Sequence, residues 1–256
     1  MVQCHGAYSS ACFTPPQLTI LYQLLNDWVD VNQTFVHSRL GLGTNYSTLV
    51  YTDNAEYGVR FLEDFVYNTT NYTASDFGYY ETVQYVNSLH SAINVNTDVD
   101  AFQARGGKLL HYHGMSDQLI PPGDSILWHS LVQQSSSAKG LSVHDWYRMY
   151  LVPGMEHCAT TNQNAPCFFA QASANAIVLD SVYSTPGYRD SRHDIVLAMM
   201  DWVERGVAPN EIIATKWYYD TVADGVEKQR PVCPYPQQAV YMGEGDVDAA
   251  YNWRCQ

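Results

Sequence analysis

The sequence predicts an α/β protein with a parallel sheet flanked by helices, and two observations lead to this fold class. Short apolar runs at 108–112 and 145–152 each end in a turn, and helical patterns follow them at 124–134 and 192–205. A strand, a turn and a helix that repeat along the chain are typical of parallel sheets covered by helices on both faces. Because such sheets usually have about five or more strands, we expect the other strands to lie in a segment outside these 256 residues.

Residues 1–98 are predicted to be mainly helical and to serve in packing. Apolar side chains recur at helical spacing over 17–31, 55–67 and 77–92. The segment 32–53 is polar and rich in Gly and Asn, which favours a loop. None of these helices carries a clear catalytic group.

From Val99 onward, strands and helices alternate. A helical turn is predicted at 99–104, a Ser/Gly linker at 135–140 and a further helix over 168–183. The helix at 192–205 ends at Gly206 and has one apolar stripe, which comprises Ile195, Val196, Met199, Met200 and Val203. The tail, 210–256, is predicted to be irregular and rich in aromatic residues.

The composition excludes several classes of partner. The formal net charge of −13 repels nucleic acid and anionic membranes, so we expect neither as a partner. No apolar run in the sequence approaches the roughly 18 residues that a membrane span requires. Hydrophobic residues make up 46% of the chain, which allows a sizeable core, and small or neutral molecules suit an acidic protein of this kind as substrates.

Cysteines and glycosylation sequons indicate a secreted, disulfide-bonded glycoprotein. The six cysteines lack the paired spacing of zinc sites; Cys4 and Cys12 can close a loop, and Cys233 and Cys255 can staple the tail. Four Asn-x-Ser/Thr sequons crowd the first third of the chain, at Asn32, Asn45, Asn68 and Asn71. The first residues show no signal peptide, so we expect the natural N-terminus to lie upstream of Met1.

Two ionisable residues occupy the turns that follow the two predicted strands. Asp117 follows the first strand and His157 the second, which is the order of acid and base in an α/β serine hydrolase. A turn-forming Asp and a loop His are the alternative, and spacing alone leaves it open. The chain contains no Gly-x-Ser-x-Gly elbow, and neither Ser116 nor Ser125 lies on a strand-to-helix elbow, so we expect the nucleophile to be absent.

His111 and His113 alternate along the first predicted strand and could bind a metal ion from one face. We favour one core histidine and one turn histidine instead, since no third residue of a metal-binding type lies at a spacing that indicates a shared site. We therefore predict no metal site in this chain.

Four longer strings occur in one order, namely GGKLLHYHGMSDQLIP from Gly106, YLVPGMEHC from Tyr150, WVERGVAP from Trp202 and CPYP from Cys233. Together they resemble the C-terminal half of the tannase and feruloyl esterase family, from about Cys12 to the end of the chain. Long strings in a fixed order are more specific than a single motif. The resemblance therefore favours the triad interpretation of Asp117 and His157.

The resemblance implies roles for individual residues. Asp117 matches the triad acid, His157 the triad base, and Cys158 a cysteine that is disulfide-bonded to the one beside the nucleophilic serine. Cys233 and Cys255 match a tail disulfide. Residues 1–98 match the C-terminal part of a lid domain, and residues 99–256 match the C-terminal part of an α/β-hydrolase catalytic domain. The family's Cys-Ser-x-Gly-Gly segment, most of its sheet strands and its calcium loop early in the lid have no counterpart here.

The implied function is hydrolysis of phenolic-acid esters, galloyl or feruloyl, by a secreted serine carboxylesterase to which this chain contributes Asp117 and His157. We expect no cofactor in catalysis, structural calcium only in the absent part of the lid, and a disulfide-linked N-terminal half as partner. The alternative is a catalytically inactive fragment that at most binds phenolics or sugars. The chain alone is expected to show no turnover.

Overall fold

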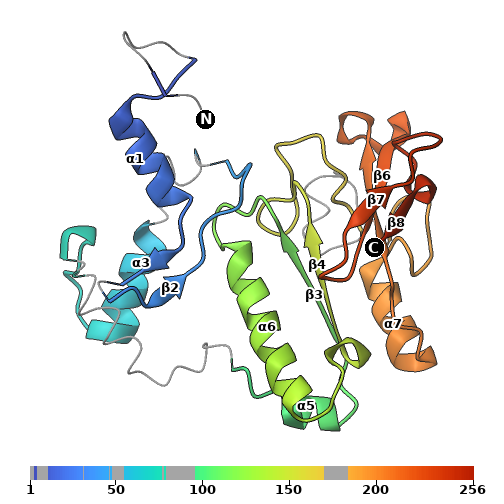
Figure 1. The fold of residues 1–256 in the computed structure, drawn as a ribbon, viewed down its shortest axis with the longest axis horizontal. Helices are drawn as coiled ribbons and strands as arrows, with labels where there is room; N and C mark the ends of the chain where they lie inside the picture. The colour runs from blue at the N-terminus through green and yellow to red at the C-terminus, as the bar shows by residue number, and fades with distance from the viewer. Residues whose placement is uncertain are drawn as a thin grey trace. The chain divides into compact units, whose positions relative to one another are not determined.

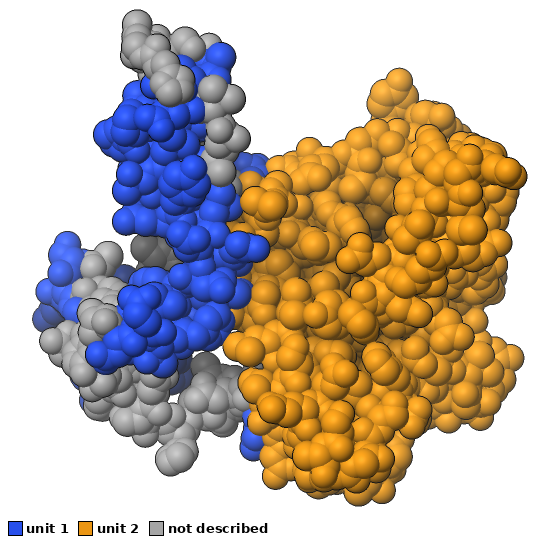
Figure 2. Space-filling model, in the orientation of Figure 1, with its two compact units in different colours: residues 1–39, 45–96 blue, residues 40–44, 97–256 orange. Residues whose placement is uncertain are grey.

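The chain forms two compact units. The computed structural model describes residues 3–4, 11–30, 32–45, 47, 55–76, 78, 96–169 and 184–256. One unit comprises residues 1–39 and 45–96, and the other comprises residues 40–44 and 97–256, coloured blue and orange in Figure 2. Asp117 and His157 both belong to the second unit.

The first unit is built from short elements. They are α1 (Pro15–Leu24), β1 (Trp28–Val29), β2 (Phe35–His37), α3 (Ala55–Phe61), a π-helical continuation at Leu62–Tyr67 and a 3₁₀ turn at Ala74–Asp76. The helix predicted over 55–67 is confirmed as α3 and its continuation. Asn32, Asn68 and Asn71 of the sequons are exposed, and Asn45 is half-buried.

The prediction of one helix over 17–31 is wrong beyond Leu24. The chain instead turns into β1, which pairs with β2 inside the segment predicted as a loop. The carboxylate of Asp30 stabilises the turn between β1 and β2. It accepts hydrogen bonds from the backbone N–H groups of Asn32 and Thr34, both at 2.8 Å. Side chains of this kind compete with helix formation and favour turns.

The second unit contains a parallel strand pair, flanking helices and two antiparallel pairs (Figure 1). Its elements are α5 (Asp100–Ala104), β3 (Leu109–Gly114), α6 (Pro122–Ala138), β4 (Tyr147–Val152), α7 (Ile195–Arg205), β5 (Ile212–Trp217), β6 (Val226–Val232), β7 (Ala239–Tyr241) and β8 (Trp253–Cys255). Short 3₁₀ turns lie at Val143–Asp145, Tyr218–Asp220, Val222–Asp224 and Ala250–Asn252. The predicted helical turn and both predicted strands are confirmed as α5, β3 and β4.

β3 and β4 pair in parallel along their full length, as predicted. Successive side chains of a strand point to opposite faces of a sheet, so this pair divides the core in two. On one face, Tyr150 belongs to a buried cluster with Ile195 of α7. On the other face, Met149 belongs to a second cluster with Val132 of α6. Both faces of the strand pair are therefore covered by helices.

The apolar stripe predicted for α7 matches the face that the helix buries only at Ile195. The buried residues are Ile195, Ala198 and Trp202, whereas Val196, Met200 and Val203 of the predicted stripe are 57%, 46% and 63% exposed. Because α7 is apolar on two sides, periodicity alone cannot determine which side meets the sheet.

The predicted linker at 135–140 is corrected by the structure, and two of the predicted helices lie mostly outside the described residues. The linker predicted at 135–140 is wrong in its first part, because α6 continues to Ala138 with Ser136 buried, and serine costs a helix only a few tenths of a kcal/mol or so. Apart from Gly78, the helix predicted over 77–92 lies outside the described residues, as does most of that over 168–183. Phe168 itself forms an antiparallel bridge with Thr215.

The irregular tail predicted over 210–256 is wrong, because it contains four strands. β5 pairs antiparallel with β6, and β7 with β8. All but one residue of β5 are buried, so its sequence lacks the apolar–polar alternation of a half-exposed strand. Within the described residues, no helix combines the length and the apolar character needed to cross a membrane.

The disulfides predicted for the two ends of the chain are present. Cys4 bonds to Cys12, and Cys233 bonds to Cys255 of β8. Cys158 and Cys167 carry thiols. Burial raises the pKa of Cys167 to about 12, and its S–H group donates to the carbonyl oxygen of Ala159.

Candidate active site

The loops that follow β3 and β4 meet because the two strands are parallel and neighbouring, which brings their carboxyl ends to one edge. Backbone hydrogen bonds join the loops: the N–H groups of Met115 and Ser116 donate to the carbonyls of Val152 and Met155, both at 2.9 Å. Gly114 permits this approach. A Cβ atom at position 114 would lie 2.3 Å from the Met155 carbonyl oxygen.

Asp117 is fully buried in the loop after β3. Its Oδ1 accepts from the backbone N–H groups of Leu119 and Ile120, at 2.8 and 2.9 Å. Its Oδ2 lies 3.0 Å from Nδ1 of His157 and 3.3 Å from Nε2 of His113. Burial by itself would raise the pKa of this carboxyl, but the hydrogen bonds together lower it to about 2. Asp117 is therefore a carboxylate at neutral pH.

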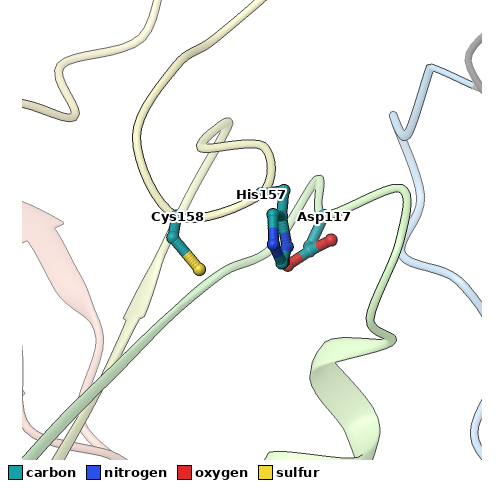
Figure 3. A group of neighbouring side chains, drawn as sticks. All are labelled: Asp117, His157 and Cys158. Atoms are coloured by element: carbon teal, nitrogen blue, oxygen red, sulfur yellow. Dashed lines mark hydrogen bonds and ion pairs between the residues drawn. The ribbon is translucent and has the colours of Figure 1, made fainter. Parts of the chain in front are cut away.

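His157, in the loop after β4, is held by this carboxylate (Figure 3). Its Nδ1 faces Asp117, and its backbone N–H donates to the side-chain oxygen of Gln118 at 3.3 Å. Because a carboxylate only accepts hydrogen bonds, Nδ1 carries the proton and Nε2 has a free lone pair. The side chain is 45% exposed, and Nε2 has no hydrogen-bond partner among the described residues. Such an imidazole can take a proton from an incoming hydroxyl.

Asp117, His157 and Cys158 could also be considered as metal ligands, since their donor atoms lie within 4.8 Å of one another. The hydrogen bonds argue against this. A metal ion would have to displace the bond between Asp117 and His157, and burial together with the charge of Asp117 raises the pKa of the Cys158 thiol. Since metals bind the thiolate, the arrangement fits an acid–base pair better.

The serines nearest to Asp117 in the sequence use their hydroxyls elsewhere. Ser116 is buried and accepts from Nε2 of Gln163 at 3.1 Å. Ser125, in the first turn of α6, lies 2.7 Å from Nδ1 of His113. Among the described residues, neither hydroxyl is hydrogen-bonded to His157.

The sequence did not show that His111 and His113 take part in the surroundings of Asp117. Both lie in β3, so the expectation that one of the two is a turn residue is wrong. Their rings lie on the same side of the strand and both bond to the hydroxyl of Ser125. The signal that could have revealed this is the spacing of the two histidines by two residues along a strand.

Comparisons with known proteins identify the family of this chain. A model of the family described as tannase and feruloyl esterase matches residues 7–256. A probable feruloyl esterase B-2 of Neosartorya fischeri is 29% identical over 257 residues, which cover 98% of this chain and 46% of that protein. An uncharacterised esterase of Xanthomonas campestris is 34% identical over 178 residues, which cover 65% of this chain and 29% of that protein. The chain thus spans about half or less of the length of these curated relatives.

Solved structures show the same relationship. Feruloyl esterase B from Aspergillus oryzae superposes with a TM-score of 0.81 at 25% identity, over 100% of this chain and 49% of that one. Tannin acyl hydrolase from Aspergillus niger superposes with a TM-score of 0.65 at 21% identity, over 95% of this chain and 42% of that one. The fold is the predicted α/β-hydrolase type, and the chain belongs to the tannase and feruloyl esterase family.

Proposed function

We propose that this chain supplies the acid and the base of a Ser-His-Asp triad that hydrolyses esters of phenolic acids, galloyl or feruloyl. The observation that carries the proposal is the hydrogen bond of 3.0 Å between Asp117 and His157 at adjoining strand ends. Asp117 stays ionised, and the exposed Nε2 of His157 has no hydrogen-bond partner among the described residues, so its lone pair is available to accept a proton. Family membership supports ester hydrolysis as the reaction.

In the proposed mechanism, a serine hydroxyl from another segment attacks the ester carbonyl carbon while Nε2 of His157 takes its proton. Collapse of the tetrahedral intermediate breaks the ester bond, and the imidazolium returns the proton to the departing alcohol. Water then attacks the acyl-serine with His157 again as base, which releases the phenolic acid. Asp117 holds the Nδ1–H tautomer and stabilises the imidazolium. The donors that stabilise the oxyanion also belong to the other segment.

The segment that supplies the serine is proposed to be the N-terminal half of the same enzyme. In the described residues, β3 pairs only with β4, so its other edge is open to a further strand. The exposed side chains of Val196, Met200 and Val203 form an apolar stripe on α7. A contiguous stripe of this kind normally marks an interface, and the missing half of an α/β sheet is its natural cover.

Cys158 is proposed to form a disulfide with a cysteine beside that serine. Its thiol is half-buried and lies within 4.8 Å of the donor atoms of Asp117 and His157, so such a bond would tie the nucleophile directly to the base. Residues 1–98 are proposed to be the end of the lid domain and residues 99–256 the end of the catalytic domain. Any structural calcium belongs to the absent part of the lid.

Secretion and glycosylation are also proposals for this chain. Two disulfides support an oxidising compartment. The exposure of Asn32, Asn68 and Asn71 supports their use as glycosylation acceptors, because a glycan needs an accessible side chain.

The test is to assay the purified chain and the chain assembled with a Cys-Ser-x-Gly-Gly-bearing N-terminal half, using methyl ferulate and methyl gallate. We expect turnover only by the assembly, and its loss on His157→Ala. His144→Ala is the matched control, because His144 lies outside the site and should leave turnover unchanged. If the assembly folds but shows no turnover, the chain is the inactive, ligand-binding fragment instead. Turnover by the chain alone would show that the nucleophile lies within it.

A further inference from the structure

A continuous series of hydrogen bonds runs from the core to the buried carboxylate. The hydroxyl of Tyr147 in β4 lies 2.9 Å from Nδ1 of His111. Nε2 of His111 lies 3.2 Å from the hydroxyl of Ser125, which lies 2.7 Å from Nδ1 of His113. Nε2 of His113 then faces two oxygens, the Ile120 carbonyl at 3.0 Å and Oδ2 of Asp117 at 3.3 Å.

The direction of these bonds follows from the groups at the two ends. A backbone carbonyl and a carboxylate only accept, so Nε2 of His113 must carry a proton. With His113 neutral, its Nδ1 accepts from the Ser125 hydroxyl. Ser125 has then used its only proton and must accept from Nε2–H of His111. Nδ1 of His111 is left to accept from Tyr147.

The opposite direction requires a protonated His113 and leaves a buried group unsatisfied. The Ser125 hydroxyl would then donate to His111, and His111 would donate to the Tyr147 hydroxyl. Tyr147 is 0% exposed, and its own proton would have no acceptor among the described residues. An unsatisfied buried donor costs about 1–3 kcal/mol, so the first direction is favoured. Burial, with the nearby His113 and His129, also lowers the pKa of His111 to about 4, which keeps that ring neutral.

We infer that His113 is a positioning residue for the triad acid, and that Ser125, His111 and Tyr147 fix its tautomer. In this arrangement each carboxylate oxygen of Asp117 has two donors, two backbone N–H groups on Oδ1 and two imidazoles on Oδ2. A carboxylate bound in this way cannot rotate, and the His157 ring is held with its Nε2 outward. The catalytic part of this inference rests on the proposed function, whereas the bonding pattern does not.

The bonding pattern is tested by ¹⁵N NMR of the histidine rings in the complete chain near pH 7. We expect protonated Nε2 on His111 and His113 and protonated Nδ1 on His157. Ser125→Ala removes the acceptor of the His111 Nε2–H group and the donor to Nδ1 of His113, so the ring ¹⁵N signals of both histidines should shift. Ser130→Ala is the matched control, because Ser130 lies on the same helix and its hydroxyl donates to the carbonyl of Ile126, away from the histidines.

The positioning role is tested in the assembled esterase. His113→Leu should lower kcat by roughly ten-fold to a hundred-fold with little change in KM, and His113→Gln, whose amide can donate to Asp117, should restore much of the loss. A doubly protonated His113 at pH 7, or a wild-type His111 with its proton on Nδ1, overturns the bonding pattern. Equal kcat in wild type and His113→Leu overturns the role. An assembly with the expected tautomers but no turnover refutes the proposed function and leaves the bonding pattern intact.

Discussion

The carbonyl oxygen of Met155 packs directly against Gly114. A Cβ atom at position 114 would lie only 2.3 Å from this oxygen, so no residue other than glycine fits there without a shift. This contact lets the loop of Asp117 and the loop of His157 share backbone hydrogen bonds. The arrangement of Asp117 and His157 therefore depends on Gly114, which has no side chain that could take part in the reaction.

Gly114→Ala should force the two loops apart. We expect a loss of roughly 1–3 kcal/mol in the free energy of unfolding, measured by urea denaturation, and a weaker hydrogen bond between Asp117 and His157. Gly58→Ala is the control, since a Cβ at Gly58 meets nothing within 4 Å. Because Gly58 lies within α3, that variant should be as stable as the wild type or slightly more so. Equal stability of wild type and Gly114→Ala would contradict the close approach.

Acid should remove the contribution of Asp117 to stability. The folded-state pKa of about 2 lies below the ordinary value of 3.8, so folding favours the ionised form. The contribution is complete above about pH 4 and is lost as the pH falls to about 2, with a size of about 2 kcal/mol. Asp117→Asn lacks this titration. The difference in unfolding free energy between wild type and variant should therefore shrink over this interval, and a constant difference would contradict the lowered pKa.

His129 should destabilise the protein in mild acid. Its ring is fully buried, and within the part of the chain that the structure describes neither nitrogen has a hydrogen-bond partner. Burial, with nearby His144, lowers its pKa to about 4. The unfolded chain binds this proton near pH 6.5, so stability should fall between about pH 6.5 and 4. His129→Leu should flatten that part of the stability profile and cost little at pH 7. A profile that is as steep in the variant as in the wild type would assign the effect to other groups.

The two thiols should differ in reactivity in the native chain. Cys167 is 2% exposed with its pKa raised to about 12, whereas Cys158 is half-buried in the loop of the candidate site. We expect iodoacetamide to modify Cys158 first and Cys167 only after unfolding, as followed by mass spectrometry. In the assembled enzyme, Cys158 should be protected until the disulfide is reduced, and Cys158→Ser should release the partner half on a non-reducing gel.

The exposed stripe of α7 should be needed for assembly. Met200→Glu places a charge between Val196 and Val203 and should weaken association with the N-terminal half, measured by size-exclusion chromatography, while the isolated chain keeps its stability. Tyr251→Ser is the control, because Tyr251 is a 71% exposed aromatic residue outside this stripe. Unchanged association of Met200→Glu would place the interface elsewhere.

The sequence alone determined the local features: the strands β3 and β4, the ionisable residues in the turns after them, the two disulfides near the chain ends, and the family. These depend on neighbouring residues or on strings in a fixed order. The tertiary structure decided which side of α7 is buried, that β5 to β8 form strands, and that His113 and Ser125 support Asp117. Each of these depends on packing between segments far apart in the chain, as between Ser125 of α6 and His111 of β3. Periodicity within one segment carries no information about which distant group will hydrogen-bond to a side chain. For that reason the position of Asp117 in the turn after β3 could be predicted from the sequence, but its supporting hydrogen bonds could not.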